Sequence, residues 1–171
     1  MALYDGLTGI PNRRHFDHEF DREFRRSARV GQPIAAIMLD LDNFKPLNDT
    51  EGHDAGDACL ARVAIALSEQ MRRPGDIVAR YGGDEFVVCL PDTDLSGATK
   101  VAARLCQAVE SLGIGVGEAS ETAYRVGATV GVASEVPTAE SGDPVTLLKT
   151  ADRALYQNKV KKVRPGVLGL A

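Results

Sequence analysis

The order of the predicted elements indicates an α+β fold with a ferredoxin-like βαββαβ core, and three observations predict it. An apolar run of strand length, PIAAIMLDL, is followed by a helical segment. The stretch RYGGDEFVVCL then carries a turn between two apolar runs, as a β-hairpin does. A second helical segment and a last strand complete the pattern by residue 133. This order places two helices on one face of a mostly antiparallel sheet, and one extra helix is expected at each end.

Four helices are expected, because an apolar residue recurs at every third or fourth position of each segment. Their expected spans are 13–30, 54–72, about 96–112 and about 143–161. Their inward faces are expected to contain Phe16, Phe20, Phe24 and Ala28, then Leu60, Val63, Leu67 and Met71, then Val101, Leu105, Val109 and Leu112. Asn12 and Ser96 are candidate N-caps, and Pro144 suits a first helical turn.

The strands are expected at 33–41, 76–81, 85–90 and 124–133. Pro91 ends the second hairpin strand. The glycine-spaced stretch LGIGVGEASE matches neither a dinucleotide loop nor a P-loop, so we interpret it as a flexible connection. The tail GVLGLA is expected either to add a short strand or to fray.

The composition is that of one domain of ordinary size, over residues 1–171. With 44% hydrophobic residues and a net charge of −4, the chain can bury a core but has no strong basic field for binding nucleic acid. Cys59, Cys89 and Cys106 lack C-x-x-C spacing, so buried thiols in a reducing compartment are expected. No apolar run approaches the roughly 18 residues of a membrane span, and no signal peptide opens the chain. We therefore expect a cytoplasmic location.

Two acidic stretches are expected to converge. Asp40 and Asp42 share one face of the first strand because side chains alternate along a strand. The turn GGDE lies at the tip of the hairpin, which can lie beside that strand. Three or four carboxylates without a basic partner repel one another. A divalent cation relieves this repulsion, and Mg²⁺ usually takes one or two carboxylates together with substrate phosphates.

Five motifs in order extend this hypothesis. They are DGLTGIPNRR, LDLDNFKPLNDTEGHDAGD, RYGGDEF, TVGVA and ADRALYQNK. Together they resemble the GGDEF domain, the diguanylate cyclase module, from residue 5 to about residue 160. Five motifs in the right order are a more specific signal than a lone GGDEF. The resemblance implies a fold similar to nucleotide cyclase and polymerase palm domains, in agreement with the element order.

The resemblance also implies a reaction, the condensation of two GTP molecules into cyclic di-GMP with release of two pyrophosphates. Each domain of the family binds one GTP, so activity requires two domains that face each other in a homodimer. Mg²⁺ or Mn²⁺ is the implied cofactor. Because family members usually carry a sensor or receiver domain upstream, we expect this chain to be the C-terminal part of a longer signalling protein.

By the same resemblance, Asp40 and Asp84 are the metal carboxylates, and Leu41 lends a backbone carbonyl. Asp84 is also the implied acceptor of the proton from the attacking 3′ hydroxyl, and Glu85 is a second acid that serves as ligand or as base. Lys45 is implied to lie near the phosphates. The cations of such a site polarise the α-phosphate and neutralise the leaving pyrophosphate. Taken without the other motifs, these acids are equally explained as solvated turn residues.

Asn48 and Asp57 are implied to recognise guanine. A carboxylate can accept hydrogen bonds from N1–H and the 2-amino group, and an amide can serve the acceptors of the base edge. Taken alone, the two residues are explained as a turn former and a helix-start acid. Gly82 and Gly83 permit positive φ and leave no side chain to block GTP, which is implied to pass over this turn.

The last helix departs from the family pattern K-x-x-G-R-N, whose lysine and arginine bind the terminal phosphates. Lys159 matches the lysine, but Lys162 stands at the glycine and Val163 at the arginine. Lys161, Lys162 or Arg164 is the candidate substitute, since a phosphate clamp accepts point charges. The alternative is a solvated basic helix end, which the helix dipole favours.

The stretch RPGD matches the R-x-x-D that forms the inhibitory product site of the family. Arg73 and Asp76 occupy its positions, and Arg104 matches a second arginine from the following helix. Arginine forks suit the guanine edge and the phosphates of cyclic di-GMP. The alternative is a loop arginine and an aspartate at the start of a strand.

Two other functions stay open. A non-catalytic receptor for cyclic di-GMP or GTP is favoured by the altered KVKKVR end and opposed by the complete acidic motifs. A structural dimerisation module predicts no nucleotide binding at all.

Overall fold

The computed structural model describes residues 2–116, 124–140 and 142–163. The predicted tail segment at 166–171 lies outside this range. The elements are, in chain order, α1 (Arg13–Val30), β1 (Ile34–Asp42), α2 (Phe44–Glu51), α3 (His53–Ser68), β2 (Ile77–Gly82), β3 (Glu85–Pro91), α4 (Leu95–Glu110), β4 (Gly115–Val116), β5 (Tyr124–Arg125), β6 (Gly127–Glu135) and α5 (Pro144–Val163). The predicted βαββαβ core with a helix at each end is confirmed.

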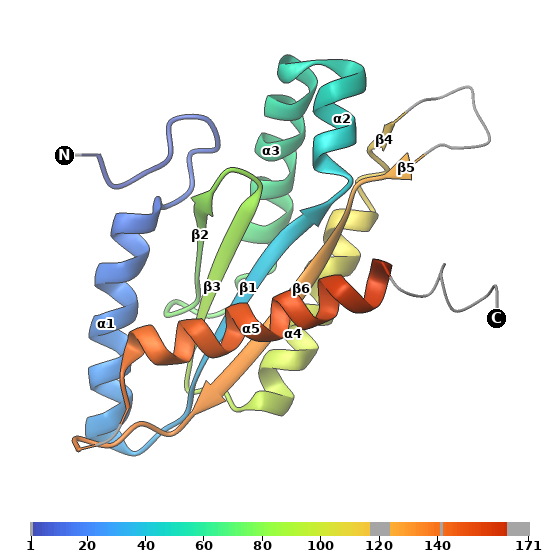
Figure 1. Ribbon diagram of the computed structural model, residues 1–171. Helices are drawn as coiled ribbons and strands as arrows, with labels where there is room; N and C mark the ends of the chain where they lie inside the picture. The colour runs from blue at the N-terminus through green and yellow to red at the C-terminus, as the bar shows by residue number, and fades with distance from the viewer. Residues whose placement is uncertain (1, 117–123, 141, 164–171) are drawn as a thin grey trace, which may run out of the picture.

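One antiparallel sheet, in the order β2-β3-β1-β6, forms the centre of the molecule. β1 pairs with β3 on one side and with β6 on the other. Figure 1 shows α3 and α4 behind the sheet and α5 crossing in front of it. A central strand covered on both faces explains why β1 is apolar in nearly every position.

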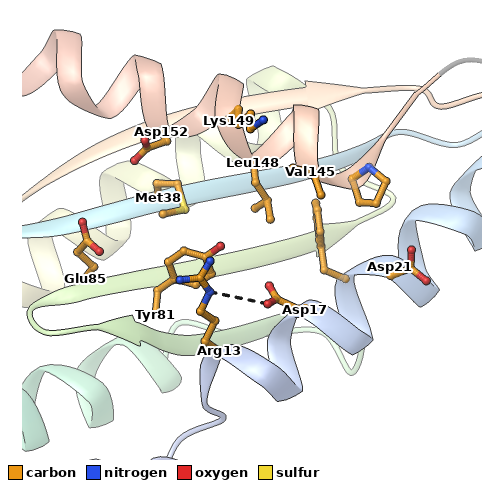
Figure 2. Close-up of a pocket in the computed structure, with 12 residues that line it drawn as sticks. Arg13, Asp17, Asp21, Met38, Tyr81, Glu85, Val145, Leu148, Lys149 and Asp152 are labelled. Carbon is orange, nitrogen blue, oxygen red and sulfur yellow. Dashed lines mark ion pairs between the residues drawn. The ribbon is translucent and has the colours of Figure 1, made fainter.

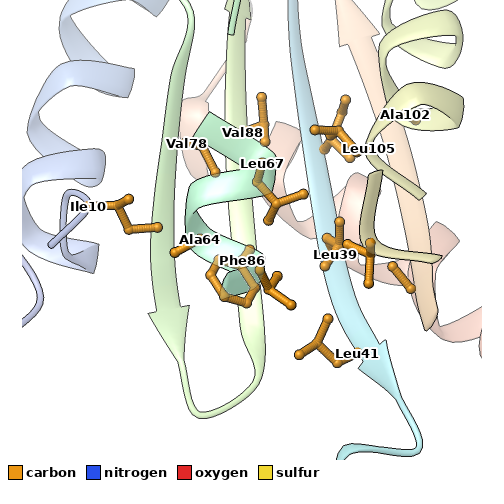
Figure 3. Close-up of a cluster of buried hydrophobic side chains, with 14 of the residues drawn as sticks. Ile10, Leu39, Leu41, Ala64, Leu67, Val78, Phe86, Val88, Ala102 and Leu105 are labelled. Carbon is orange, nitrogen blue, oxygen red and sulfur yellow. The ribbon is translucent and has the colours of Figure 1, made fainter. Parts of the chain in front are cut away.

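The face of the sheet toward α3 and α4 holds the larger apolar core (Figure 3). β1 contributes Ala35, Ile37, Leu39 and Leu41 to this face, because alternate residues of a strand point to the same side. The helix side chains that pack on them include Leu60, Val63 and Leu67 of α3 and Ala102, Leu105 and Val109 of α4. All of these except Ala102 were predicted; Val101, predicted in its place, is only partly buried, as are Met71 and Leu112, which lie beyond the helix ends.

The opposite face of the sheet is covered by α1 and α5. The aromatic stripe Phe16, Phe20 and Phe24 is buried as predicted. The predicted N-cap is also confirmed, since Asn12 Oδ1 accepts the His15 N–H at 3.0 Å. The stripe continues through buried Ser27, whereas Ala28 is only half-buried. A helix has 3.6 residues per turn, so a spacing of four drifts off the buried face and a step of three restores it.

In the first half of the chain, one helix was not predicted and the end of another was placed too late. α2 was not expected, because its sequence FKPLNDTE is short and contains Pro46, which is tolerated only because it lies in the first turn. The following helix ends at Ser68 and not at residue 72. By Met71 the backbone bonds to the third residue back and no longer to the fourth, since the Met71 N–H donates to the Ser68 carbonyl at 3.1 Å. Pro74 disfavours helical backbone in the residue before it.

Two predictions for the second half also need correction. The N-cap of α4 is Asp94 and not Ser96, since the Asp94 side chain accepts the Gly97 N–H at 2.8 Å. The strand expected at 124–133 is divided at Val126, because β5 pairs with β4 whereas β6 pairs with β1. The glycine-spaced stretch therefore contributes β4 to a small second sheet, and the rest of it, from residue 117, lies outside the described residues.

The cysteines and the helices can be compared with what the composition predicted. Cys59 and Cys89 are buried, Cys106 is half-buried, and all three are free thiols. No helix within the described ranges has the length and apolar character needed to cross a membrane.

α5 crosses β6 directly over Gly131, and this contact yields a test of the packing. A Cβ at Gly131 would lie 2.1 Å from the Ala151 carbonyl oxygen and 2.2 Å from the Leu155 nitrogen. Both are helix backbone atoms, so no side-chain rotation relieves the overlap. We expect Gly131→Ala to lower the free energy of unfolding in urea by about 2–3 kcal/mol. Gly6→Ala is the control, since nothing lies within 4 Å of its Cβ. Equal stability of the two variants would contradict this account of α5.

Candidate active site

The end of β1 meets the hairpin turn. In the register of β1 against β3, Asp40 lies opposite Glu85. The next residue, Leu41, donates its N–H to the backbone carbonyl of Asp84 at 3.2 Å. The backbone therefore brings Asp40, Asp84 and Glu85, three of the residues singled out from the sequence, to one edge of the sheet.

The carboxylates of this edge repel one another. Burial raises the pKa of Asp40 to about 6, the negative charges of Asp84 and Glu85 add to the rise, and the Lys159 ammonium opposes it. Burial together with the charges of Asp84 and Asp152 also raises the pKa of Glu85. Like charges this close resist ionising together, so the cluster favours the binding of a further cation.

Lys159 of α5 supplies positive charge to this edge. Its Nζ lies 3.4 Å from Asp40 Oδ2 and donates a hydrogen bond to the Leu41 carbonyl oxygen at 3.1 Å. The ammonium therefore contacts two of the three groups that were predicted to bind metal.

The donor set fits a hard cation. Asp40, Asp84 and the Leu41 carbonyl offer only oxygen atoms, which Mg²⁺ prefers. In the described ranges, no group of three His, Cys, Asp or Glu side chains is assembled to hold a metal ion by itself. At nucleotide sites, phosphate oxygens and water complete the coordination of Mg²⁺.

Asp42, the second acid of β1, anchors α5. Its Oδ1 accepts hydrogen bonds from Lys159 Nζ at 2.9 Å and from Thr129 Oγ1 at 2.7 Å. Its Oδ2 accepts from Lys162 Nζ at 2.8 Å. Burial raises the pKa of Asp42, but these hydrogen bonds outweigh burial and lower it. Both carboxylate oxygens are thus engaged with other side chains.

The basic end of α5 offers three candidate substitutes for the family arginine, and the structure separates them. Lys162 also donates to the Ala128 carbonyl at 2.9 Å, so its ammonium is already paired on two sides. Lys161 is exposed, and Arg164 lies outside the described residues. Like Lys159, Lys162 would have to leave these partners to contact a phosphate.

The hairpin turn is open on its outer side and braced from within. Within the described residues, no atom lies within 4 Å of a Cβ built at Gly82 or Gly83, and Gly83 has a φ of +42° that favours glycine. Arg80 Nε donates to the Gly83 carbonyl at 3.0 Å, and its guanidinium pairs with Asp5 at 3.2 Å. Neither Arg80 nor Asp5 was singled out from the sequence, since partners 75 residues apart give no local pattern.

The predicted base contacts lie on α2 and α3. Asn48 is in α2, and Asp57 is exposed in α3. Asn48 Oδ1 is buried and has no hydrogen-bond partner within the described residues. Lys45 is exposed in the first turn of α2, three residues after the last acid of β1. Along the chain, α2 begins two residues after β1 ends, and α3 begins two residues after α2 ends.

The R-x-x-D residues line a second pocket, of about 550 Å³, together with Arg104. Arg73 Nε lies 3.6 Å from Asp76 Oδ1, and the Arg73 guanidinium donates to the Pro91 carbonyl at 2.7 Å and to the Thr93 hydroxyl. Asp76 Oδ1 and Arg104 Nε are buried atoms that lack a hydrogen-bond partner in the described part of the chain. A buried acceptor and a buried donor in one pocket suit a polar ligand.

Figure 2 shows a further pocket, of about 580 Å³, between α1, α5 and the sheet, with Glu85 at its edge. The Arg13 guanidinium lies 4.3 Å from the centre of the Tyr81 ring and 3.8 Å from Asp17. The apolar lining of this pocket includes Phe20, Met38 and Leu148. This pocket was not predicted, because its walls come from segments as far apart as residues 13 and 152.

The chain matches the family described as "Diguanylate cyclase, GGDEF domain" over residues 2–164, and it therefore belongs to this family. It is 40% identical over 172 residues to Response regulator PleD of Caulobacter vibrioides, covering 100% of this chain and 37% of that protein. It is 36% identical over 159 residues to Diguanylate cyclase DgcP of Pseudomonas aeruginosa, covering 92% and 22%. The chain thus spans well under half the length of these relatives.

Solved structures share the fold. The GGDEF domain of DgcB from Caulobacter crescentus in complex with c-di-GMP has a TM-score of 0.82 and 30% identity, over 94% of this chain and 92% of that chain. Diguanylate cyclase SiaD in complex with its activator SiaC from Pseudomonas aeruginosa has a TM-score of 0.81 and 37% identity, over 94% and 59%. The expected palm-like α+β fold is confirmed.

Asp40→Asn tests the repulsion among the acids. The fold raises the pKa of Asp40 from 3.8 to about 6, so the folded state holds this proton more tightly than the unfolded state does. Stability without metal therefore falls as pH rises through that interval. In chelator, we expect the variant to match wild type near pH 4 and to be more stable by roughly 1 kcal/mol near pH 7, after allowance for solvent screening. Urea unfolding at both pH values measures the gap, and a gap independent of pH would contradict the assignment.

Proposed function

We propose that this chain is a diguanylate cyclase domain, which condenses two GTP molecules into cyclic di-GMP and releases two pyrophosphates. The observation that carries the proposal is the meeting of Asp40, Asp84 and Glu85 at one edge of the sheet, beside the Lys159 ammonium. Membership of the family, and relatives that are named diguanylate cyclases, support it.

The proposed metal site consists of Asp40, Asp84 and the Leu41 carbonyl. Mg²⁺ or Mn²⁺ bound there supplies Lewis-acid chemistry, polarising the α-phosphate and neutralising the pyrophosphate that leaves. Asp84 accepts the proton of the attacking 3′ hydroxyl. Glu85, whose pKa is raised by burial and by Asp84, is a second acid suited to hold a proton or to act as a further ligand.

The proposed GTP site runs from α2 and α3 to the end of α5. Asn48 and Asp57 bind guanine, and the nucleotide crosses the open turn at Gly82 and Gly83, where no side chain obstructs it. Lys45 and Lys159 contact the phosphates. Lys159 contacts two of the proposed metal donors, so it must turn from them to contact the phosphates.

Two such domains must face each other in the proposed reaction, because each site holds one GTP and the attacking hydroxyl belongs to the other. The proposed active form is therefore a homodimer. Since the chain covers 37% of Response regulator PleD, we further propose that an upstream sensor or receiver domain controls this encounter.

Product feedback is proposed for the pocket of Arg73, Asp76 and Arg104. Two arginines offer planar donor forks to phosphates and to the guanine edge, and Asp76 offers an acceptor to guanine N–H groups. Asp76 Oδ1 and Arg104 Nε, which have no hydrogen-bond partner among the described residues, support a polar ligand there. The structure of the DgcB GGDEF domain contains c-di-GMP, which makes this nucleotide the first ligand to test.

The second candidate function is a non-catalytic receptor for cyclic di-GMP or GTP. Two changes at the end of α5 favour it, Lys162 at the family glycine and Val163 at the family arginine. The complete set of acids opposes it.

Asp84→Ala and Arg73→Ala separate enzyme from receptor. With the chain fused to a constitutive dimeriser, GTP and Mg²⁺ are expected to yield cyclic di-GMP and pyrophosphate, detected by chromatography and mass. Asp84→Ala should lower turnover by about 100-fold or more and leave cyclic di-GMP affinity unchanged in calorimetry. Arg73→Ala should weaken that affinity at least tenfold, about 1.4 kcal/mol, and keep turnover. Wild type and Asp84→Ala that bind cyclic di-GMP equally but are equally inert toward GTP would favour the receptor.

Val163→Arg tests the departure from the family pattern. A guanidinium at this position adds a charge-assisted contact to phosphate, so we expect the KM for GTP to fall about tenfold with little change in kcat. Val163→Met is the uncharged control. An unchanged KM in the arginine variant would mean that another basic residue already fills this role.

A further inference from the structure

Gly56 of α3 lies directly beneath the amide of Asn48. A Cβ built at Gly56 would lie 1.7 Å from Asn48 Oδ1 and 2.8 Å from Asn48 Cγ. No real Cβ is found this close to another heavy atom, so any side chain at residue 56 displaces the amide. Gly56 is buried within a regular helix and is not among the glycines with positive φ. Its backbone therefore gives no reason for glycine, and the neighbouring amide does.

The Asn48 amide is positioned by its packing against Gly56. Its Oδ1 is buried and has no hydrogen-bond partner in the part of the chain that the structure describes. The oxygen lies 1.7 Å from the position of a Cβ at Gly56, where glycine offers only a Cα–H group, which is a weak donor. A glycine inside a helix and a buried oxygen without a partner are both locally unfavourable. Local choices that disfavour stability are expected at functional positions.

We infer that Gly56 is a positioning residue for base specificity, because it seats the Asn48 amide against α3. The next residue is Asp57, so one turn of α3 provides both the seat of the amide and the carboxylate. Asp57 can accept from N1–H and the 2-amino group of guanine, and adenine has neither donor there. The seated amide of Asn48 serves the remaining edge of the base. This inference rests on the proposed guanine site. It adds that Gly56 keeps the side chains of Asn48 and Asp57 in a fixed position relative to each other.

The test is a double-mutant cycle with Gly56→Ala, Asn48→Ala and both together. Thermal unfolding reports on the contact between Gly56 and the Asn48 amide without any nucleotide. In wild type, Gly56→Ala is expected to lower Tm, because the methyl group displaces the amide. In the Asn48→Ala background the same change should raise Tm, because the overlap is gone and alanine is the better helix former. An equal effect of Gly56→Ala on Tm in both backgrounds would contradict the claim that Gly56 positions the Asn48 amide.

Base specificity is read with α,β-methylene analogues of GTP and ATP, which are not turned over, in the presence of Mg²⁺. Wild type should prefer the guanine analogue. Gly56→Ala should lose about tenfold in affinity for it and little for the adenine analogue, and the double variant should bind no worse than Asn48→Ala alone. Gly56→Ala that keeps the full guanine preference would overturn the positioning role. A wild type without guanine preference would instead contradict the proposed guanine site, and the Tm cycle would still decide whether Gly56 seats the amide.

Discussion

The register of β1 against β3 is the constraint on which the proposed site depends. Alternate residues of β1 up to Leu39 are buried against α3 and α4, and the residues between them face α1 and α5. A slip of one residue would exchange the two faces, so the apolar core sets the register. The same register places Asp40 opposite Glu85 at the end of the strand. The core therefore maintains a set of carboxylates that would separate if only their charges acted.

α5 completes this arrangement from the other face of the sheet. Its close approach to β6 at Gly131 directs the helix so that Lys159 reaches the acidic edge. Asp42 accepts hydrogen bonds from both Lys159 and Lys162, and so connects the end of α5 to the end of β1. Lys159 thus places a cation of the chain itself against the acids. Lys162, at the family glycine position, is held in this arrangement by Asp42 and by the Ala128 carbonyl.

Much of this arrangement could be predicted from the sequence, because its signals are local. Periodicity predicted α1 and the inward faces of α3 and α4, and alternation along β1 predicted the shared face of Asp40 and Asp42. The features that were missed depend on contacts across the fold. α2 is too short for periodicity and contains a proline. The brace between Asp5 and Arg80, and the fit of Gly56 beneath Asn48, join residues whose spacing carries no pattern. The shape of the pocket beside Glu85 likewise needs three separate segments.

The central claim is that the acidic edge of the sheet is a metal-dependent GTP site. The most direct test is a crystal structure of the chain with Mg²⁺ and a GTP analogue that resists cleavage at the α-phosphate. The account predicts Mg²⁺ bound by Asp40, Asp84 and the Leu41 carbonyl, with Lys159 turned from these donors to the phosphates and guanine against Asn48. A nucleotide bound only in the pocket of Arg73, with Lys159 still paired to Asp40, would contradict it.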